Sequence, residues 1–405
     1  MPTQIRPARP DEMAEYGAIA AYVYAGRYGH VPDNLVSRST HPDWTLCAFV
    51  DGRMVTTFAT IPFTVRLNGQ AAKLGGVSGI GTLPEYRRQG LMRQIMCQAM
   101  ADMRDRGQFI AALWASQAAI YQRFGFALCT HMLHYTIDPR DIRFTGQSQA
   151  SGTCQRHHVD QGFAMIRQLY IDFISSRTGY LHRARPLWAN NALADRAEDG
   201  PVHIAVASDV EQRPQGYMVY TTQFGRVDDT ARPQEMVIRD LVWLTPDAYV
   251  CLWDFVTKHD LVGRVRYDTA PLDDPAPELF DEPRLLHPQI TEGIWMRLVD
   301  VAQALQARGY TTAGRLVFEI VGDSIADWNN GVFRLETDGQ CGHVTRTTDA
   351  PDIRLSIKAL ASLFSGFRTA QALANWGLLA GDQPGIESAD RIFRTLHLPH
   401  CPDHF

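Results

Sequence analysis

Lysine is scarce in this sequence of 405 residues, and charges of opposite sign nearly balance. Lysine stands only at positions 73, 258 and 358, so arginine supplies almost all of the 39 basic residues, which face 44 acidic ones. The formal net charge of −5 argues against nucleic acid or an anionic membrane as the main partner, because both are bound through an excess of positive charge. An acidic balance instead suits cationic ligands.

Three further absences bound the class of protein. The polar start, residues 1–12, lacks the apolar core of a secretory signal, and no apolar run is long enough to cross a membrane. We therefore expect a cytoplasmic protein. The pair His157-His158 has no cysteine or carboxylate at ligand spacing, so no metal site is expected. Scattered reduced thiols are expected, because neither a CxxC motif nor paired spacing occurs among Cys47, Cys97, Cys129, Cys154, Cys251, Cys341 and Cys401.

The stretch from Val77 to Met92 predicts a strand, a turn and the start of a helix. Residues from Val77 to Leu83 are apolar or small, and Pro84 ends the strand because proline cannot donate a hydrogen bond to a sheet. From Leu91 onward, apolar residues recur at three- and four-residue steps. This spacing predicts an amphipathic helix.

The turn Arg87-Arg88-Gln89-Gly90 has the composition of an anion site. A helix start leaves backbone N–H groups unpaired and carries partial positive charge. The two arginines add full charges, and the glycine lets the backbone approach a ligand, so the turn suits a diphosphate. Neither the Gly-Lys-Ser/Thr of a Walker loop nor the three spaced glycines of a dinucleotide fingerprint is present. On these four residues alone, a solvated surface turn is an equal alternative.

The surrounding residues sharpen this interpretation. The order strand, Pro84, Arg87-Arg88-x-Gly90, amphipathic helix, buried strand 109–114 and second helix resembles motif A of the GCN5-related N-acetyltransferases. The run Ala-Ser-Gln-Ala-Ala-Ile-Tyr-Gln-Arg-Phe-Gly-Phe, residues 115–126, resembles the Eis (enhanced intracellular survival) branch of that family. The resemblance implies that the turn grips the pyrophosphate of acetyl-CoA. It assigns cofactor binding to Ile80, Gly81, Thr82, Arg87, Arg88, Gln89, Gly90, Leu91, Met92 and Ser116.

Tyr121 lies on the helix that we expect Ser116 to cap. From its position alone, a core tyrosine with a satisfied hydroxyl is the better interpretation, since most half-buried tyrosines are structural. The resemblance instead implies that Tyr121 is the general acid that protonates the departing CoA thiolate. A phenol with a pKa near ~10 suits this role because it stays protonated at neutral pH.

The last residues are Pro399-His400-Cys401-Pro402-Asp403-His404-Phe405. A frayed end is the ordinary expectation for a terminus, but two prolines stiffen this one. The resemblance implies that the free carboxylate of Phe405 enters the first domain's active site and takes a proton from the substrate amine. His404 is a rival base, because its pKa is better matched to neutral pH.

Fold class follows from the order of the elements. Hairpin turns at Asp51-Gly52 and Asn68-Gly69, with a long strand from Met54 to Leu67 that we expect Pro62 to interrupt, precede the motif and indicate a mixed α/β sheet. Later strands and a helix after Thr245 repeat this order without an Arg-Arg-x-Gly turn, which suggests a degenerate copy without its own cofactor. The end of the chain resembles a sterol-carrier-protein-like domain.

We therefore expect an α/β (α+β) protein with tandem acetyltransferase folds and a sterol-carrier-protein-like α/β domain. Its domains would span residues 1–143, 154–285 and 290–405. Eis-like proteins are commonly hexamers, so a homo-oligomer is expected.

The resemblance predicts an acetyl-CoA-dependent N-acetyltransferase, an acyltransferase that acts on primary amines by direct attack and needs no metal. Its substrate would be an aminoglycoside-like or other polyamine small molecule, and position alone suggests His30, Trp44, Phe63 and His404 for its pocket. Two alternatives stay open. The protein could be a biosynthetic acyltransferase that uses another acyl-CoA, or a non-catalytic acyl-CoA or lipid-binding protein.

Overall fold

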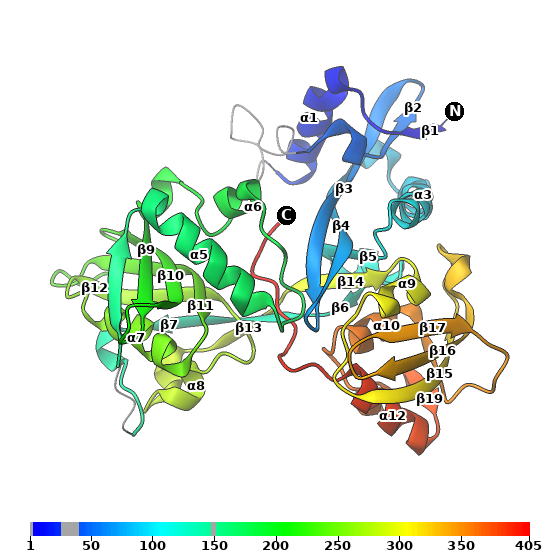
Figure 1. Ribbon diagram of the computed structural model, residues 1–405. Helices are drawn as coiled ribbons and strands as arrows, with labels where there is room; N and C mark the ends of the chain where they lie inside the picture. The colour runs from blue at the N-terminus through cyan, green and yellow to red at the C-terminus, as the bar shows by residue number, and fades with distance from the viewer. Residues whose placement is uncertain (1–2, 26–39, 147–150) are drawn as a thin grey trace. The chain divides into compact units, whose positions relative to one another are not determined.

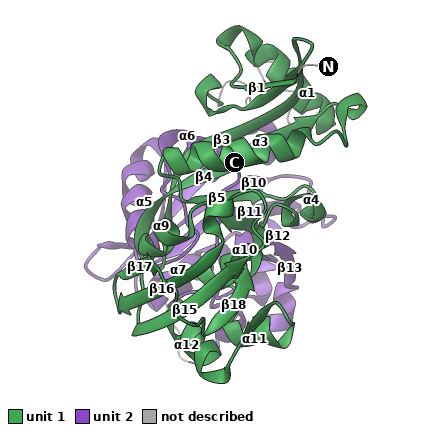
Figure 2. Cartoon of the chain, turned by 90° about the vertical axis from the view of Figure 1, so that its right-hand side faces the viewer, with its two compact units in different colours: residues 1–129, 294–394, 405 green, residues 130–293, 395–404 purple. Residues whose placement is uncertain are grey.

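The computed structural model describes residues 3–25, 40–146 and 151–405 (Figure 1). The chain forms two compact units, which Figure 2 shows in different colours. Unit 1 comprises residues 1–129, residues 294–394 and Phe405, and unit 2 comprises residues 130–293 and 395–404. In the described ranges, no helix is long and apolar enough to cross a membrane. Each of the three sheets contains one parallel pair of strands, which confirms the predicted mixed α/β class.

The first sheet lies in unit 1 and has seven strands. In sheet order these are β1 (Thr3–Arg6), β2 (Cys47–Val50), β3 (Arg53–Leu67), β4 (Gln70–Thr82), β5 (Ile110–Trp114), β14 (Ile294–Leu298) and β6 (Ala127–Leu128). The helices associated with it are η1 (Pro10–Glu12), α1 (Met13–Val23), η2 (Pro42–Trp44), η3 (Pro84–Tyr86), α3 (Leu91–Asp105) and α4 (Ala118–Gln122).

Helices α1 and α3 cover opposite faces of this sheet. Tyr16 of α1 is buried with Phe49 of β2, whereas Ile95 and Met100 of α3 are buried with Val50. Neighbouring residues of a strand point to opposite faces, so one four-residue strand supplies both cores. The three- and four-residue spacing of the α3 apolar residues is thereby explained by burial against one sheet face.

Both predicted hairpin turns are confirmed. The first residues of these turns, Asp51 and Asn68, have φ of 50° and 49°, in the left-handed region that two-residue hairpin turns require. The expected interruption at Pro62 is wrong, because β3 runs unbroken for 15 residues and Pro62 pairs with Gly75 of β4. The registered pairing of β2 with β3 ends at Thr56, so β3 has no registered partner on that side at Pro62. The missing N–H of Pro62 therefore removes no hydrogen bond from the sheet.

The second sheet forms the core of unit 2. In sheet order its strands are β13 (Gln289–Glu292), β7 (His131–Ile137), β12 (Val262–Ala270), β11 (Gln234–Trp243), β10 (Pro214–Gln223), β9 (Val202–Ser208) and β8 (Thr153–His157). The helices of unit 2 are η4 (Pro139–Asp141), α5 (Val159–Ile174), α6 (Arg185–Asn190), η5 (Ala197–Asp199), α7 (Pro246–Thr257), α8 (Ala276–Leu279) and η6 (Pro283–Leu286).

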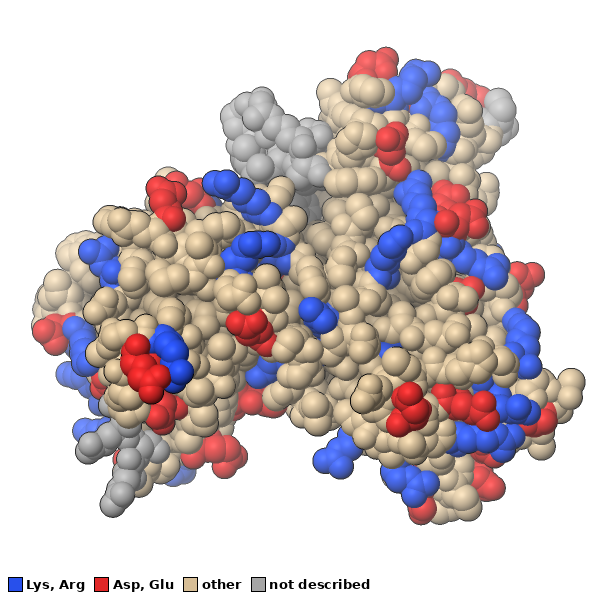
Figure 3. Space-filling view, in the orientation of Figure 1, with Lys and Arg blue, Asp and Glu red and all other residues tan. Residues whose placement is uncertain are grey.

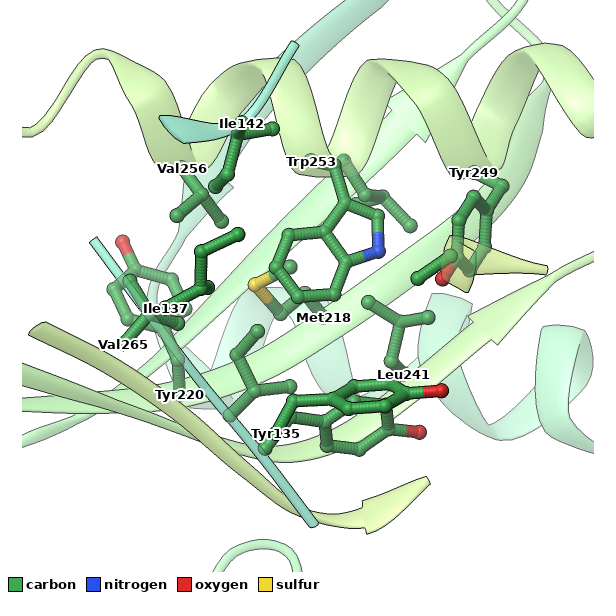
Figure 4. Close-up of a cluster of buried hydrophobic side chains, with 14 of the residues drawn as sticks. Tyr135, Ile137, Ile142, Met218, Tyr220, Leu241, Tyr249, Trp253, Val256 and Val265 are labelled. Carbon is green, nitrogen blue, oxygen red and sulfur yellow. The ribbon is translucent and has the colours of Figure 1, made fainter. Parts of the chain in front are cut away.

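Two helices also cover opposite faces of the second sheet. Figure 4 shows Trp253 and Tyr249 of α7 above the sheet, in one buried cluster with Met218 and Leu241. On the other face, α5 packs its apolar side in a separate cluster that includes Tyr217. Unit 2 therefore repeats the layered arrangement of the first sheet.

The third sheet belongs to unit 1. In sheet order its strands are β17 (Gly342–Arg346), β16 (Gly331–Asp338), β15 (Ala313–Val321), β18 (Ile353–Ser356) and β19 (Leu379–Gly381). Its helices are α9 (Val301–Gln306), η7 (Asp327–Asn329), α10 (Ile357–Phe364), α11 (Ala370–Asn375) and α12 (Gln383–Phe393).

The two compact units do not follow the three successive segments expected from the sequence. Strand β7, within the expected first segment, belongs to the unit 2 sheet, while β14 inserts between β5 and β6 of the first sheet. The chain thus passes to unit 2 after Cys129 and returns at Ile294. The limits 1–143, 154–285 and 290–405 stay a prediction for the domains as folding segments.

Candidate active site

The predicted anion-binding turn joins β4 to α3. Arg88 and Gly90 both have left-handed backbones, with φ of 64° and 81°. Gly90 is the N-cap of α3, and no side chain hydrogen bonds the helix start. The turn is exposed, and Arg87 Nε donates to the Thr82 carbonyl at 2.9 Å, which ties the turn to the end of β4. A helix start left uncapped by side chains offers its N–H groups to an anion.

The matching helix of unit 2 has a different start. The Oγ1 of Thr245 accepts a hydrogen bond from the N–H of Ala248 at 3.2 Å and so caps α7 from within the chain. A cap of this kind takes up a donor that a phosphate would otherwise use. The uncapped start of α3 and the capped start of α7 agree with one anion site, in unit 1, and with a degenerate second copy.

Strands β4 and β5 separate beside this turn. Their parallel pairing is registered from Leu74 to Gly76 on β4 and ends at Ala112 on β5. On its other edge β5 pairs with β14 from Ile110 to Trp114, while β4 continues to Thr82 along β3. The second half of β4 therefore has an edge without a registered partner, and its backbone groups are available to an extended ligand.

The predicted residues Ile80, Gly81 and Thr82 lie on this second half of β4. A kink precedes them, because Gly79 has φ of 61° and the register with β3 shifts between Thr57 and Ala59. Thr57 Oγ1 donates to the Gly79 carbonyl at 2.7 Å, which holds the bulge in place. A bulge of this kind turns the end of a strand.

Two further bonds fix the end of β4. The Tyr24 hydroxyl donates to the Ile80 carbonyl at 2.8 Å, and Thr56 Oγ1 donates to Thr82 Oγ1 at 3.2 Å. Tyr24, which follows α1, and Thr56 of β3 thus hold the end of β4 in place. Leu91 and Met92 open α3, with Leu91 buried in its core and Met92 packed at the edge.

Tyr121 is buried on the short helix α4, with its ring 6.3 Å from that of Phe126 in an edge-to-face arrangement. The expectation that Ser116 caps this helix is wrong. Gln117 holds the N-cap position, no side chain makes a capping bond, and Ser116 is exposed in the bend before it. With only one turn of helix, the local pattern did not fix where α4 begins.

The end of α4 is held by a buried ion pair. Arg297 of β14 donates to both carboxylate oxygens of Asp323, at 2.8 and 2.6 Å, and to the Phe124 carbonyl. Gly125 follows with φ of 80°, directly over the Arg297 guanidinium. The Nε of Arg297 is buried without a partner in the described structure, but its other donors bond Asp323 and the Phe124 carbonyl, so the pair holds the turn that follows Tyr121.

Phe405 belongs to unit 1 although it is the last residue of the chain. Its ring lies 4.9 Å from that of Phe63 on β3. Gly76 lies beside both rings: a Cβ at this position would come within 2.4 Å of Phe63 and 2.9 Å of Phe405. Glycine at position 76 thus makes room for the terminal aromatic where β4 and β5 begin to separate.

Phe63 and Trp44 also line one cavity of about 400 Å³ in unit 1. Its charged lining residues are Asp43, Lys73 and Arg106. The structure therefore brings together two of the four predicted substrate residues. His30 lies outside the described residues, and His404 belongs to unit 2.

The tail segment, residues 395–404, is anchored in unit 2 by charge. The buried Arg183 donates to Asp403 at 2.8 Å and to Asp240 at 2.5 Å. Asp240 and Asp403 outweigh burial and hold the pKa of Arg183 above its ordinary value. The Tyr217 hydroxyl donates to Asp240 at 2.6 Å. A fully buried arginine between two carboxylates is a strong, directional anchor.

Backbone contacts fix the rest of the tail segment. Asn191 accepts from the His404 N–H at 2.8 Å and donates to its carbonyl at 3.1 Å. The buried ring of His400 bonds the Thr269 carbonyl at 3.0 Å through Nε2, and burial lowers the pKa of His400 to about 4. His400 is therefore neutral at pH 7. The frayed end that termini ordinarily show is absent from residues 399–403, which are buried.

Sequence reasoning missed Gly76, Arg183, Asn191 and Arg297. Gly75-Gly76 inside an apolar strand was an available signal, because glycine in a strand often marks a close approach. Arg183, Asn191 and Arg297 act through partners at least 20 residues away, so no local pattern indicates them. All seven cysteines are free, as expected. The described residues contain no group of three or more potential metal ligands.

Three family models match the chain. An acetyltransferase (GNAT) domain matches residues 4–129, a second acetyltransferase (GNAT) domain matches residues 179–298, and a sterol carrier protein domain matches residues 301–402. These matches confirm the predicted tandem arrangement and the nature of the last domain.

Relatives extend over most of the chain. An uncharacterized N-acetyltransferase of Streptomyces avermitilis is 30% identical over 380 residues, which are 90% of this chain and 89% of the relative. The N-acetyltransferase Eis of Mycobacterium tuberculosis is 28% identical over 304 residues, or 74% and 72% of the two chains. The crystal structure of Eis1 from Mycobacterium abscessus superposes with a TM-score of 0.85 at 26% identity and full coverage of both chains. The chain is thus similar to Eis and combines two acetyltransferase domains with a sterol-carrier-protein domain. It therefore belongs to the GCN5-related N-acetyltransferases.

Proposed function

We propose that this protein transfers the acetyl group of acetyl-CoA to a primary amine of a small molecule. The turn from Arg87 to Met92 would hold the pyrophosphate, and the edge of β4 at Ile80–Thr82 would hold the extended arm of the cofactor. The uncapped start of α3 and the separation of β4 from β5 fit such a ligand. Acetyl-CoA brings the thioester that the reaction consumes.

The chain's own groups would move two protons. The neutral amine attacks the thioester carbonyl, the new C–N bond forms, and the terminal carboxylate of Phe405 takes a proton from the nitrogen. The C–S bond then breaks, and the Tyr121 hydroxyl gives a proton to the CoA thiolate. The products are the acetylated amine and CoA. A backbone N–H of the free β4 edge would stabilise the oxyanion in between.

One observation carries this proposal: Phe405 belongs to the acetyltransferase unit. The Phe405 ring packs on Phe63 beside Gly76, at the point where β4 and β5 separate. A binding protein would need no such packing of Phe405 against the sheet.

The test is acetyl-CoA-dependent release of free thiol with a panel of amines, aminoglycosides included. Three variants separate the terminal carboxylate from the ring: deletion of Phe405, Phe405→Leu, and addition of one glycine after Phe405. The added residue displaces the carboxylate by ~3.5 Å but keeps the ring. Loss of a general base costs roughly 10²- to 10⁴-fold in rate.

We expect deletion and extension to lose activity and Phe405→Leu to keep most of it. Activity in the extended variant equal to wild type would rule out the carboxylate as base. If none of the amines causes thiol release although CoA binds, the result would favour another acyl donor or the binding-protein alternative. Cytoplasmic location and homo-oligomeric assembly stay predictions.

A further inference from the structure

A cavity of about 590 Å³ lies in unit 2 and is complete within that unit, because its lining residues fall between positions 183 and 269 or between 402 and 404. Arg266 of β12 lines it, whereas its chain neighbours Val265 and Tyr267 lie in the core with α7. Strand residues alternate between faces, so the floor of the cavity is the sheet face opposite α7.

Two rows of paired residues cross three neighbouring strands of this floor. In one row, Thr221 of β10 pairs with Val237 of β11, which pairs with Arg266 of β12. The other row consists of Gln223, Glu235 and Arg264. Residues paired across a sheet share a face, and all members of both rows line the cavity. The floor thus presents a hydroxyl, an amide and two guanidinium groups.

Positive charge exceeds negative charge in this cavity. Arg183 lines it but is already held by Asp240 and Asp403. We call the cavity the arginine cavity after its other five arginines, which are Arg196, Arg226, Arg239, Arg264 and Arg266. They face three lining carboxylates, those of Asp199, Glu235 and Asp268. The chain as a whole carries −5, and on the face drawn in Figure 3 basic and acidic side chains are interspersed. These five arginines therefore depart in sign from the protein's overall charge.

One carboxylate serves two of the five arginines. The Asp199 carboxylate lies 2.6 Å from the guanidinium of Arg239 and 3.7 Å from that of Arg196. Burial lowers the pKa of Arg239 below its ordinary value, and the positive charge of Arg196 lowers it further, although Asp199 works against both. A positive group that has lost hydration without full compensation is stabilised by a further anion.

Arg226 carries the least compensated charge of the set. It donates to two neutral oxygens, the Gln223 side chain at 2.7 Å and the Glu198 carbonyl at 3.2 Å. Each of the other four arginines lies within ion-pair distance of a carboxylate, whereas the described part of the chain provides none for Arg226. Its guanidinium can therefore bind an incoming anion without giving up a carboxylate partner.

Two buried polar atoms of the floor lack a partner. Thr221 is 1% exposed, and its Oγ1 makes no hydrogen bond in the described structure. The Nε of Arg266, in the same row across the strands, is likewise buried without a partner there. Buried polar groups are nearly always hydrogen bonded, so an unpaired hydroxyl and an unpaired guanidinium N–H in one cavity indicate a ligand with oxygen acceptors.

We propose that the arginine cavity is a binding site for a small molecule that carries a carboxylate or a phosphate group. Arg226 and Arg239 would supply positive charge to its oxygens, and the Thr221 hydroxyl would donate a hydrogen bond to one of them. Guanidinium groups match the geometry of both oxyanions. This inference goes beyond the proposed acetyl transfer and does not depend on it, because every group that it uses lies in unit 2.

Calorimetric titration of the full-length protein tests the proposal. Inorganic phosphate and succinate are the anionic probes, and succinamide is the neutral match of succinate. We expect one of the anions to bind about tenfold or more tightly than succinamide, since hydrogen bonds to charged groups are the stronger ones. The tighter of the two anions identifies the favoured group. Binding of neither anion, or equal binding of succinate and succinamide, would overturn the proposal.

Arginine variants locate the bound anion. Arg226→Gln should lower the affinity about 10- to 100-fold, because it removes a charge-assisted bond, and Arg226→Lys should recover part of the loss. The matched control is Arg213→Gln, since Arg213 is exposed in the turn between β9 and β10 and pairs with Asp209. Equal losses in Arg226→Gln and Arg213→Gln would contradict the assignment. So would a loss in Arg88→Gln with none in Arg226→Gln, which would place the anion at the turn before α3.

Thr221→Val separates a role in binding from a role in folding. Valine has nearly the shape of threonine but no hydroxyl, so the affinity for the anion should fall about 3- to 10-fold. Because the hydroxyl makes no hydrogen bond in the described structure, urea unfolding without anion should show no loss of stability. Lower stability with unchanged affinity would count against the proposal.

The same protein preparations separate this site from the proposed function. Anion binding that Arg226→Gln weakens, in a protein that acetylates no amine, would support the site and count against the proposed transfer. Acetylation of amines without binding of phosphate or succinate would refute the anion site alone.

Discussion

The buried carboxyl group of Asp274 predicts how the stability of the unit 2 core depends on pH. The residue is 5% exposed, and its Oδ1 accepts hydrogen bonds from the Tyr249 hydroxyl at 2.7 Å and the Ala276 N–H at 3.0 Å. Its Oδ2 is buried without a hydrogen bond in the described structure. Burial raises the pKa of Asp274 from 3.8 to about 7, because the charged form loses hydration that these bonds do not replace.

The sign of the effect on stability follows from linkage. A carboxyl whose pKa is higher in the folded than in the unfolded state stabilises the fold fully below pH 4 and loses that contribution as pH rises through 7. With a pKa of 3.8 unfolded and about 7 folded, the contribution falls by roughly 2.5 kcal/mol between pH 5 and pH 8.

Asp274→Asn tests this magnitude. Asparagine has the shape of the protonated carboxyl and keeps an Oδ1 that can accept both hydrogen bonds, but it does not ionise. We expect the variant to gain roughly 2.5 kcal/mol relative to wild type when pH is raised from 5 to 8. Urea unfolding of unit 2, followed by tryptophan fluorescence at both pH values, gives this difference, in which contributions shared by both proteins cancel.

The neighbouring Asp273 is the matched control, with the opposite sign. Although burial works against it, a hydrogen bond from His397, the nearby Arg177 and the N–H of Leu398 together lower its pKa. Asp273 therefore stabilises the fold above its unfolded pKa and loses that contribution as pH falls. Asp273→Asn should lose stability at pH 8 and less at low pH. A pH-independent difference for Asp274→Asn, or the same sign for both variants, would refute the reasoning.

Two further predictions concern the acetyl-transfer site. Arg88→Ala should raise the KM for acetyl-CoA about tenfold with little change in kcat, because it removes one phosphate contact of the ground state; steady-state kinetics with varied acetyl-CoA checks this, and an unchanged KM would count against the turn. Tyr121→Phe should lower kcat by roughly 10²-fold with an unchanged KM for acetyl-CoA, since only the acid is lost; full activity in a folded variant would remove Tyr121 from that role.

Local patterns predicted the elements around the cofactor turn well. Pro84, the exposed arginines and the apolar spacing after Leu91 gave the end of β4 and the course of α3, because hydrogen bonding and side-chain periodicity act over a few residues. The two hairpin turns could be predicted equally well, since the left-handed positions of two-residue turns favour Asn, Asp and Gly.

The predictions from sequence were wrong where residues close in space but distant in sequence determine the local structure. Pro62 does not break β3, because that stretch of the strand is an edge, and an edge can be recognised only once the neighbouring strand has been placed. Ser116 does not cap α4: Gln117 holds the N-cap position, and the turn that follows this one-turn helix is held by the distant pair of Arg297 and Asp323. Neither circumstance can be read from the adjacent sequence.

Local sequence patterns were enough to predict the class of protein, the strand–turn–helix from β4 to α3 and the two hairpin turns. Three features became visible only in the folded chain: β14 inserts into the first sheet, Arg183 and Asn191 anchor the tail segment, and arginines from separate segments meet in one cavity. The physical reason is sequence separation: periodicity and capping act over one or two turns of chain, whereas ion pairs and sheet insertion join residues far apart that only the folded core brings together.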